Sequence, residues 1–430
     1  MFKVVETFSG IGSQAQALKN IGIDYEIQAI SEWEIAALYA YDILHNGKQD
    51  LSLYRHHTKE SLVEELKKYS LSNNGSKPIS ELSLYSMSNH SLKSILYAIE
   101  RTNNLVDITK VHASHIPEGI DLLTYSFPCQ DLSIAGRWHQ NEGGIDKGAN
   151  NRSTLLWEVQ RLLHEHAEEN RKMPRFLLME NVRNILAEAN ISNFREWQKD
   201  LEELGYVNQV WTLDARNFGV PQSRVRTFML SVHADEDTRE LIQDYFYRYN
   251  LEDVVRSKSA QGKLENYLKL DYSQPIYRME AIESTPALTP SREKIYLNNE
   301  MLASDDIVFN EKFARTVTTK QDRNPNSGIV GFKNIQLVKH NNKYRNLTPR
   351  ECFLLMGFSE DKFDLLMENN PMVAMDRKIL PNSKLTKLAG NSIVVDVLEN
   401  VFKFIMNLDS FINQKDEVYK IEGLYERFIV

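Results

Sequence analysis

Short apolar runs alternate along the chain with segments in which apolar residues recur at helical spacing. Short apolar runs bounded by turn residues are typical of buried strands. The pattern predicts strands over residues 3–7, 25–31, 120–126, 176–179 and 227–232, and a first helix over 14–20. Strands that alternate with helices predict an α/β fold with a doubly wound, mostly parallel sheet. In such sheets the chemistry lies beyond the carboxyl ends of the strands.

Two segments interrupt this alternation. Residues 46–105 are long and polar, with helical stretches around 59–69 and 91–102, and we interpret them as an insertion. Residues 235–312 are acidic and show no clear periodicity, whereas the chain becomes helical again from 347. We therefore expect a large domain over 1–234, a second, smaller domain over 235–346, and C-terminal helices over 347–430.

Composition narrows the class of protein. The 430 residues, 42% of them apolar, can bury cores for two domains. No apolar run approaches the ~20 residues of a membrane helix, and the N-terminus enters a strand without a signal-peptide pattern. The two cysteines exclude a disulfide framework and a cysteine-based metal cluster, and they suit a reducing cytosol. We expect a cytoplasmic protein without a metal or a membrane partner.

The charge distribution is more informative than the net charge of −8. Between residues 315 and 350, Asp322 is the only acid among many basic residues. Such a run indicates either a solvated face or a strip that contacts phosphates. Its members are Arg315, Lys320, Arg323, Lys333, Lys339, Lys343, Arg345 and Arg350.

A glycine turn, Phe8 to Gly12, follows the first predicted strand. Glycines let the backbone approach a ligand, although such a turn occurs in many α/β proteins. Its spacing differs from the dinucleotide pattern, which disfavours a nicotinamide oxidoreductase. Glu32 closes the next strand about 20 residues later, which suits a carboxylate that binds a ribose. Trp33 beside it is either a stacking platform for an adenine or a packing residue.

Three further motifs stand at predicted strand ends. A lone cysteine is usually a small core residue, but Cys129 follows Pro128 in a predicted loop where it would be exposed, which favours a nucleophile provided that its pKa is lowered. Glu180 is either a site acid or a solvated loop residue. Arg224 and Arg226 would point to one side of an extended strand, where they bind a polar substrate or face solvent.

In this order, the motifs resemble those of the bacterial DNA (cytosine-5) methyltransferases over nearly the whole chain. The insertion over 46–105 departs from the shortest members of that family. The resemblance rests on the Phe8–Gly12 turn, Glu32-Trp33, Asp107-Ile108-Thr109, Pro128-Cys129-Gln130, 152–156, Glu180-Asn181-Val182, Gln222/Arg224/Arg226, 315–318, 347–351 and 390–393.

The resemblance implies a class I methyltransferase fold that uses S-adenosylmethionine and releases S-adenosylhomocysteine. Cys129 would add to C6 of a flipped cytosine and so activate C5 for methylation. Glu180 would hold the base at N3 and the exocyclic amine, Arg226 its O2 edge, and Arg224 the site or a phosphate. Asn181 would shape the turn, and residues 133–145 would close as a lid.

The resemblance also implies the cofactor and DNA contacts, with the C-terminal helix returning to the catalytic domain. Cofactor contacts would come from Phe8, Gly10, Ile11, Gly12, Glu32, Trp33, Asp107, Ile108, Pro128, Leu155, Asn391 and Ser392. We place DNA recognition in the second domain, with Gln222, Arg315, Lys339, Lys343 and Arg345 as DNA contacts.

The expected partner is double-stranded DNA, bound by a monomer in the bacterial cytosol. The enzyme would serve a restriction-modification system, with a cognate restriction endonuclease associated only genetically. A tRNA substrate is the alternative within the same chemistry. A non-catalytic DNA-binding partner is the alternative from another class, and the intact Cys129 and Glu180 argue against it.

Overall fold

A computed structural model describes residues 1–129, 132, 144–149, 151–254, 262–332, 342–374, 377–414 and 421. The chain forms two compact units. Unit 1 comprises Met1–Leu213, Val225–Val255 and Glu399–Val430, and unit 2 comprises Asp214–Arg224 and Arg256–Leu398. The loop expected to act as a lid, 133–145, lies outside the described residues except for its last two positions.

Unit 1 is built on a six-stranded sheet in the order β2-β1-β3-β4-β7-β5. β1 pairs in parallel with β2 and β3, β3 pairs in parallel with β4, and β7 runs antiparallel to β4. The predicted mostly parallel sheet is therefore confirmed. The strands are β1 (Phe2–Thr7), β2 (Tyr25–Ser31), β3 (Leu122–Tyr125), β4 (Phe176–Val182), β5 (Tyr206–Asp214) and β7 (Val225–His233).

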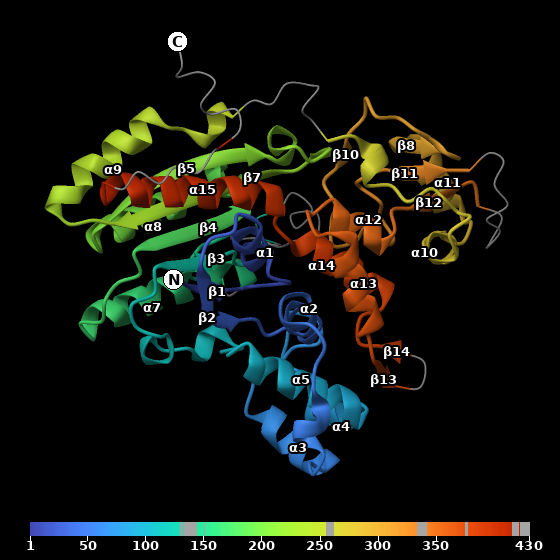
Figure 1. Ribbon diagram of the computed structural model, residues 1–430, viewed down its shortest axis with the longest axis horizontal. Coiled ribbons are helices and arrows are strands. Elements are labelled where there is room, and N and C mark those ends of the chain that lie inside the picture. Colours follow the sequence, from blue (N-terminus) through green and yellow to red (C-terminus); the bar gives the residue numbers. More distant parts are fainter. Residues whose placement is uncertain are drawn as a thin grey trace. The chain divides into compact units, whose positions relative to one another are not determined.

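Helices cover both faces of this sheet (Figure 1). Neighbouring residues of β2 show it: Ala29 joins the cluster that contains α7 and α8, whereas Ile30 packs with Ala15 of α1 and Tyr41 of α2. Both faces are buried at the centre of the sheet, so β3 and the first part of β4 are apolar runs rather than alternating patterns. The helices are α1 (Ser13–Asn20), α2 (Ile35–Asn46), α7 (Leu156–Glu168) and α8 (Glu188–Glu203).

The insertion forms a small helical layer beside α2, with α3 (Lys59–Lys67), α4 (Glu81–Tyr85) and α5 (Asn89–Arg101). Four apolar side chains in its centre have no exposed surface, namely Leu62 and Leu66 of α3 and Leu92 and Ile95 of α5, whereas Leu82 of α4 is exposed. The two helical stretches predicted here are confirmed, each within two residues at its ends. The insertion is thus an ordered part of unit 1.

The units differ from the expected domains at both boundaries. α9 (Glu236–Arg248), expected in the second domain, belongs to unit 1 because Tyr245 packs on Phe404 of α15 (Val395–Ile412), with ring centroids 5.1 Å apart. Trp211 of β5 meets the same ring at 4.9 Å. Residues 347–398, expected to return to the first domain, belong to unit 2, and only the chain from Glu399 onward returns.

Unit 2 contains a four-stranded sheet, β12-β11-β8-β9, and a parallel pair of β6 with β10. Its strands are β6 (Gln222–Ser223), β8 (Met301–Ser304), β9 (Ile307–Val308), β10 (Ala314–Arg315), β11 (Ile329–Gly331), β12 (Tyr344–Asn346), β13 (Met372–Ala374) and β14 (Arg377–Lys378). Its helices are α10 (Pro275–Glu283), α11 (Pro290–Asn298), α12 (Pro349–Leu354), α13 (Glu360–Glu368) and α14 (Asn382–Asn391). The segment 235–312 is therefore structured, although its sequence shows no periodicity.

Within the described residues, no helix is long and apolar enough to cross a bilayer. The same residues contain no cluster of His, Cys, Asp and Glu arranged to hold a metal ion.

Candidate active site

The turn after β1 adopts the left-handed backbone that its glycines predict. Phe8, Gly10 and Gly12 have φ of 55°, 56° and 78°. A Cβ at Gly12 would lie 2.3 Å from Nε2 of His45, so only glycine fits there. At Gly10 a Cβ would meet no atom within 4 Å, which leaves open space over the turn. The turn is therefore tight on one side and accessible on the other.

Glu32, at the end of β2, is held firmly beside this turn. Its Oε2 accepts a hydrogen bond from the Gly10 N–H at 3.0 Å, and its Oε1 accepts one from the Glu34 N–H at 2.7 Å. The predicted proximity of the turn and Glu32 is thus seen in the structure. Two bonds to N–H groups fix the orientation of the carboxylate before any ligand arrives.

Asp107 and Ile108 lie beyond the edge strand β2, after a strained turn. Val106, immediately before them, has φ of 62°, which is a rare conformation for a β-branched residue. The Ser31 hydroxyl donates to the Val106 carbonyl at 3.1 Å, and Arg161 of α7 donates to the Ile108 carbonyl at 3.2 Å. Backbone strain of this kind often marks functional sites. The sequence analysis did not single out Val106.

Glu6 is a second residue that the sequence analysis passed over. It lies in β1 two positions before Phe8, and its side chain is completely buried. Burial raises the pKa of Glu6 to about 8, because the Tyr41 hydroxyl and the Ala15 N–H offset only part of the desolvation. A buried acid is expected to be neutral at pH 7 under these conditions. A charged residue in the middle of an apolar strand was the available signal.

Cys129 stands in the loop after β3 and is partly exposed. The loop is anchored at its start, where the Ser153 hydroxyl donates to the Pro128 carbonyl at 2.8 Å. It is anchored again by Asn181, whose Nδ2 donates to the Phe127 carbonyl at 3.0 Å. Leu132 N–H closes a turn onto the Cys129 carbonyl at 3.1 Å. The cysteine is therefore positioned by fixed backbone on its N-terminal side.

The other cysteine offers a contrast. Cys352 is fully buried in α12, and burial raises the pKa of its thiol well above the usual range. A neutral, buried thiol is inert as a nucleophile. Because the chain has two cysteines, Cys129 is the one available for thiolate chemistry.

Glu180 and Arg226 form an ion pair on neighbouring strands. Arg226 Nε lies 3.2 Å from Glu180 Oε1, and both side chains are more than four-fifths buried. β4 is longer than predicted and includes Glu180, because its antiparallel partner β7 continues the pairing to Val182 and Arg226. Met179, the residue before Glu180, pairs with Tyr125 at the end of β3. The strand ends that carry Cys129 and Glu180 are therefore adjacent in the sheet.

Arg224 organises unit 2. Its side chain is almost fully buried, and it donates to the carbonyls of Val317, Gly390 and Ser392 at 2.9, 3.0 and 2.6 Å. Three motifs that are far apart in sequence meet at this guanidinium. A Cβ at Gly390 would lie 2.4 Å from the Thr318 backbone, which explains the glycine. Arg224 thus supports the fold of unit 2 rather than a phosphate.

Two residues expected to contact DNA are buried instead. Gln222 has no exposed surface, because its amide donates to the Leu355 carbonyl and accepts from the Val317 N–H, each at 2.9 Å. Arg345 also has no exposed surface and forms two bonds of 2.7 Å with the carboxylate of Glu351. Both predictions of DNA contact are wrong, because the two side chains are buried and form hydrogen bonds with residues of unit 2.

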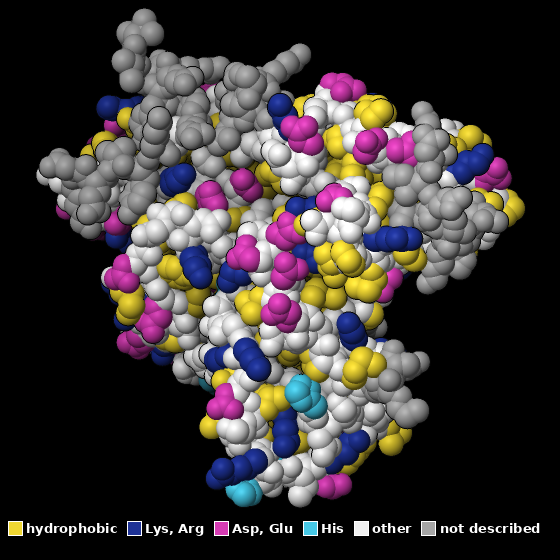
Figure 2. Space-filling view, turned by 45° about the vertical axis from the view of Figure 1, so that its right-hand side comes forward, with side chains coloured by type: hydrophobic (Ala, Val, Ile, Leu, Met, Phe, Trp, Pro, Cys, Tyr) yellow, Lys and Arg dark blue, Asp and Glu magenta, His cyan; other side chains and the backbone are white. Residues whose placement is uncertain are grey.

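The rest of the basic run divides into exposed and buried members. Arg315 and Arg323 are exposed beside Glu300 and Asp322, and Lys320 and Lys343 are exposed as well, whereas Arg350 is buried. Lys333 and Lys339 lie outside the described residues. Figure 2 shows cationic and acidic side chains interspersed on the face in view. The described members of the run therefore do not all face solvent, because Arg345 and Arg350 are buried.

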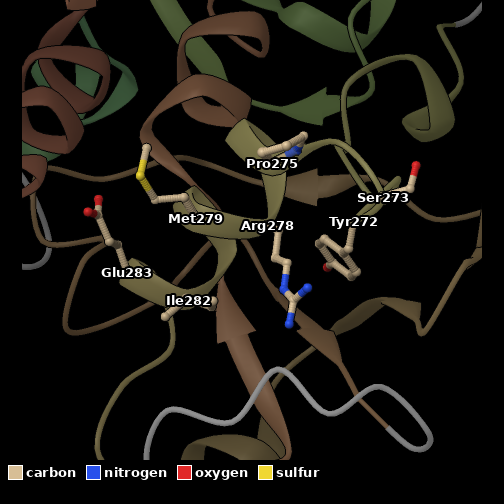
Figure 3. A pocket seen from close by; sticks show the side chains of 7 residues that line it. All are labelled: Tyr272, Ser273, Pro275, Arg278, Met279, Ile282 and Glu283. Carbon is tan, nitrogen blue, oxygen red and sulfur yellow. The ribbon is translucent and has the colours of Figure 1, made fainter.

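Unit 2 also has an open recess of about 500 Å³ along α10 (Figure 3). The Arg278 side chain reaches toward the Tyr272 ring, whereas Met279 and Glu283 point to the other side. Ile282, Pro275 and Ser273 complete the lining. Glu283 accepts a hydrogen bond from Asn382 at 3.0 Å. The recess combines one guanidinium with apolar and aromatic walls.

The remaining predicted cofactor residues are divided between the units. Trp33, Pro128 and Leu155 are partly exposed in unit 1, and Ile11 is buried there under the glycine turn. Asn391 and Ser392 belong to unit 2, where Asn391 is exposed and the Ser392 hydroxyl bonds to the Leu388 carbonyl.

The doubly wound sheet, with β7 antiparallel beside β4 and a glycine turn after β1, is the fold of the class I methyltransferases, enzymes that use S-adenosylmethionine. The model of the C-5 cytosine-specific DNA methylase family matches residues 67–407, and the chain belongs to this family. The protein is therefore a DNA (cytosine-5) methyltransferase.

Two curated relatives are similar over almost their whole length. The orphan methyltransferase M.SssI of Spiroplasma monobiae is 31% identical over 93% of this chain and 96% of the relative. The type II methyltransferase M2.ScrFI of Lactococcus lactis subsp. cremoris is 31% identical over 94% of this chain and 98% of the relative. The solved Dnmt2 methyltransferase of S. pombe has a TM-score of 0.54 at 17% identity, covers 96% and 99% of the two chains, and shows the shared fold.

Proposed function

We propose that the enzyme methylates a flipped cytosine through a covalent bond between Cys129 and C6. One arrangement carries the proposal: Cys129 follows β3, Glu180 lies near the end of the neighbouring β4, and its ion-pair partner Arg226 lies at the start of β7. C5 of cytosine is a poor nucleophile, and addition of a thiolate to C6 makes it enamine-like. A base stacked in a duplex must leave the helix to reach such a thiolate.

The proposed reaction has two halves. The Cys129 sulfur bonds to C6, the C5=C6 electrons attack the methyl carbon, and the carbon–sulfur bond of the methyl donor breaks. S-adenosylmethionine supplies the electrophilic methyl group and is released as S-adenosylhomocysteine. A base, such as a water molecule, then removes the C5 proton, and the returning electrons expel the Cys129 thiolate. Atoms and charge balance over the two halves.

Glu180 and Arg226 would hold the base during addition. Glu180 faces N3 and the exocyclic amine in this proposal, and Arg226 faces O2. The two groups lie 3.2 Å apart, and both side chains are mostly shielded from water. Fixed charges in a shielded site stabilise the charge that develops on the base. Asn181 acts by tying the two strand ends together.

The residues of unit 1 suit the adenosine and methionine parts of the cofactor. Open space lies over Gly10, and the Glu32 carboxylate is fixed beside it. Glu32 would take the ribose hydroxyls. Trp33, Asp107 and Ile108 would hold the adenine, whereas Phe8, Ile11 and Gly12 would lie near the methionine. Pro128 and Leu155 would complete the site in unit 1, and cofactor contact by Asn391 and Ser392 stays a prediction from the sequence.

The substrate follows from the family, and its form is part of the proposal. We place a monomer on duplex DNA in the bacterial cytosol, reading a specific site with unit 2. Relatives at the same identity are described as orphan and as type II methyltransferases, so the comparisons favour neither setting. We propose that any cognate restriction endonuclease is associated with the enzyme only genetically.

Bisulfite sequencing of duplex DNA exposed to the enzyme and S-adenosylmethionine tests the substrate. We expect protected cytosines at one recurrent sequence, and a matched tRNA incubation is expected to show none. Protection confined to the tRNA would overturn the assignment to DNA. The read-out gives the target and the strand in the same measurement.

Substitution of the nucleophile tests the mechanism. Cys129→Ser should reduce methyl transfer by at least about three orders of magnitude, because a hydroxyl is far less nucleophilic than a thiolate. DNA binding and the thermal midpoint should stay near wild type. With 5-fluorocytosine at the target, wild type should form an adduct that survives denaturing electrophoresis, because fluorine does not leave as a proton does. The Cys352→Ser variant is the matched control. An active Cys129→Ser enzyme, or a missing adduct, rejects the covalent route.

A further inference from the structure

The insertion lies in sequence between the two proposed adenosine-binding segments. It begins after α2, which starts just behind Glu32 and Trp33, and it ends immediately before Asp107 and Ile108. We propose that the insertion is a brace for the adenosine side of the cofactor site, with Asn104 and Ser72 as its positioning residues. This inference rests on the proposed cofactor site.

Asn104 holds the backbone of Glu32 with both ends of its amide. Its Oδ1 accepts from the Glu32 N–H at 3.0 Å, and its Nδ2 donates to the Glu32 carbonyl at 2.9 Å. The same Oδ1 accepts from the Val106 N–H at 2.9 Å. Asn104 is buried, so these bonds are sheltered from water. One side chain therefore sets the distance between the Glu32 segment and the turn that leads to Asp107.

Ser72 secures the other side of the same segment. Its backbone N–H donates to the Trp33 carbonyl at 2.8 Å, and its carbonyl accepts from the Ile35 N–H at 2.9 Å. The Ser72 hydroxyl donates to the Lys77 carbonyl at 2.6 Å and accepts from the Gly75 N–H at 3.0 Å, which closes its own loop. Ser72 has no exposed surface. The insertion thus forms an isolated parallel bridge with the chain beside Trp33, between Ser72 and Glu34.

A buried ion pair fastens the insertion to α2. Arg101, at the end of α5, donates to both oxygens of Asp42 at 2.6 and 2.7 Å. It also donates to the Gly47 carbonyl at 2.7 Å, just after α2 ends. Asp42 is fully buried, so the pair is screened little by salt. Movement of α5 is therefore transmitted to α2 and to the loop before it.

The brace holds a strained backbone turn at Val106. A left-handed Val persists only where its surroundings enforce it. Asn104 on one side and Ser31 on the other bond to the Val106 backbone. Without the brace we expect this turn to relax and to carry Asp107 and Ile108 with it.

Two lysines of α3 in the insertion are already paired with carboxylates. On α3, Lys67 bonds to Glu64 and Glu81, and Lys68 bonds to Glu65. Surface cations that already have carboxylate partners offer little net charge to DNA. In contrast, the contacts of the insertion with Glu32, Trp33 and Val106 are buried and specific.

The test is Asn104→Ala in the full-length enzyme. We expect the Kd and the KM for S-adenosylmethionine to rise about tenfold, because two backbone groups of Glu32 lose their buried partner. The kcat at saturating cofactor and the Kd for duplex DNA should change less than about twofold. Asn104→Asp keeps the acceptor oxygen and should give an intermediate KM. If Asn104→Ala does not fold, Asn104→Asp carries the comparison.

Asn103→Gly is the matched control within the same turn. Asn103 has φ of 45°, which suits glycine, and it bonds to Gln28 rather than to Glu32. Its variant should keep the wild-type KM. Double-mutant coupling with Glu32→Ala shows the route of action, because the two effects should be less than additive.

The outcomes separate the brace from the cofactor site itself. If Glu32→Ala weakens cofactor binding and Asn104→Ala does not, the brace is wrong and the site stands. If neither variant weakens binding, the adenosine site assigned to unit 1 is wrong. If Asn104→Ala weakens DNA binding and leaves the cofactor KM unchanged, the insertion serves the substrate.

Discussion

At the scale of the single residue, burial of Glu6 in β1 makes the stability of the protein depend on pH. The pKa of Glu6 is raised from 4.5 to about 8 by this burial. Between these pH values the unfolded chain has lost the proton that the folded chain keeps. The free energy of unfolding therefore falls as pH rises through this window, by up to about 1.4 kcal/mol per pH unit. Below pH 4.5 and above pH 8 this contribution no longer changes.

Glu6→Gln removes this pH dependence while keeping the shape of the side chain. We expect the variant to be more stable than wild type at pH 7, by about 1–3 kcal/mol, and to differ little at pH 4.5. Urea unfolding of both proteins at several pH values between 4.5 and 8.5 measures the difference. The exposed Glu64→Gln is the control and should follow wild type. Parallel pH profiles for Glu6→Gln and wild type would show that Glu6 is ionised in the folded protein.

Residue types at strand ends were predictable, whereas their internal partners were not. Cys129 and Glu32 are recognisable because a strand pattern and a turn place them locally. Gln222 and Arg345 resemble surface residues in sequence, and they are buried because Val317, Leu355 and Glu351 satisfy them. Such pairing depends on contacts between distant segments, which no local pattern reports.

At the scale of the element, the strands with two buried faces were the easiest to predict. β2 was predicted at its observed bounds although Glu26 and Gln28 interrupt its apolar residues, because turn residues bound the segment. β5 was not predicted, since Asn208, Gln209 and Thr212 interrupt its apolar residues at the edge of the sheet. β4 ends later than predicted because the pairing with β7 extends it.

The start of α12 illustrates how much an element depends on a buried charge. Arg345 and Glu351 are fully buried partners, and Glu351 also accepts from the Thr348 N–H at 2.8 Å as part of the helix cap. Arg345→Met should destabilise the protein by about 3–5 kcal/mol, because Glu351 keeps a buried charge without its cation.

Urea unfolding measures this loss, with Arg323→Met as the matched control. Arg323 is exposed beside Asp322, so its substitution should cost less than about 1 kcal/mol. Equal stability of the two variants would mean that Arg345 is solvated and available to DNA. Because Arg345 is buried and paired with Glu351, the salt dependence of DNA binding should be unchanged in Arg345→Met.

At the scale of the whole molecule, the fold class was predictable and the division into units was only approximate. Strands alternate with helices along the chain, and this alternation is visible in local patterns, so the α/β class could be predicted. The division depends on which surfaces pack together. α9 joins unit 1 through Tyr245 and Phe404, which are far apart in sequence. Likewise, Arg224 draws residues 317 and 390–392 into unit 2.

Sequence recognition is expected to reside in unit 2, and this prediction is tested by exchange. Residues 262–332 hold α10, α11, β8 and the recess beside Arg278. Between 262 and 312 acids outnumber cations, so this segment is suited to reading base edges at a few positions rather than to gathering phosphates. Replacing it with the matching segment of a relative that has another target should change which cytosine is protected from bisulfite conversion.

The exchange must keep two contacts that anchor this segment to α12, one through a side chain and one through the backbone. Glu280 bonds to Arg350, and the Lys269 N–H donates to Glu351 at 2.8 Å. With both retained, the hybrid should fold with a thermal midpoint near that of wild type and keep its affinity for S-adenosylmethionine. An active hybrid that still methylates the original site would place recognition outside 262–332. Arg278→Ala in the wild-type background then tests whether the Arg278 side chain itself reads a base. Loss of discrimination at one position, with an unchanged salt slope, is the result expected of a guanidinium that reads a base.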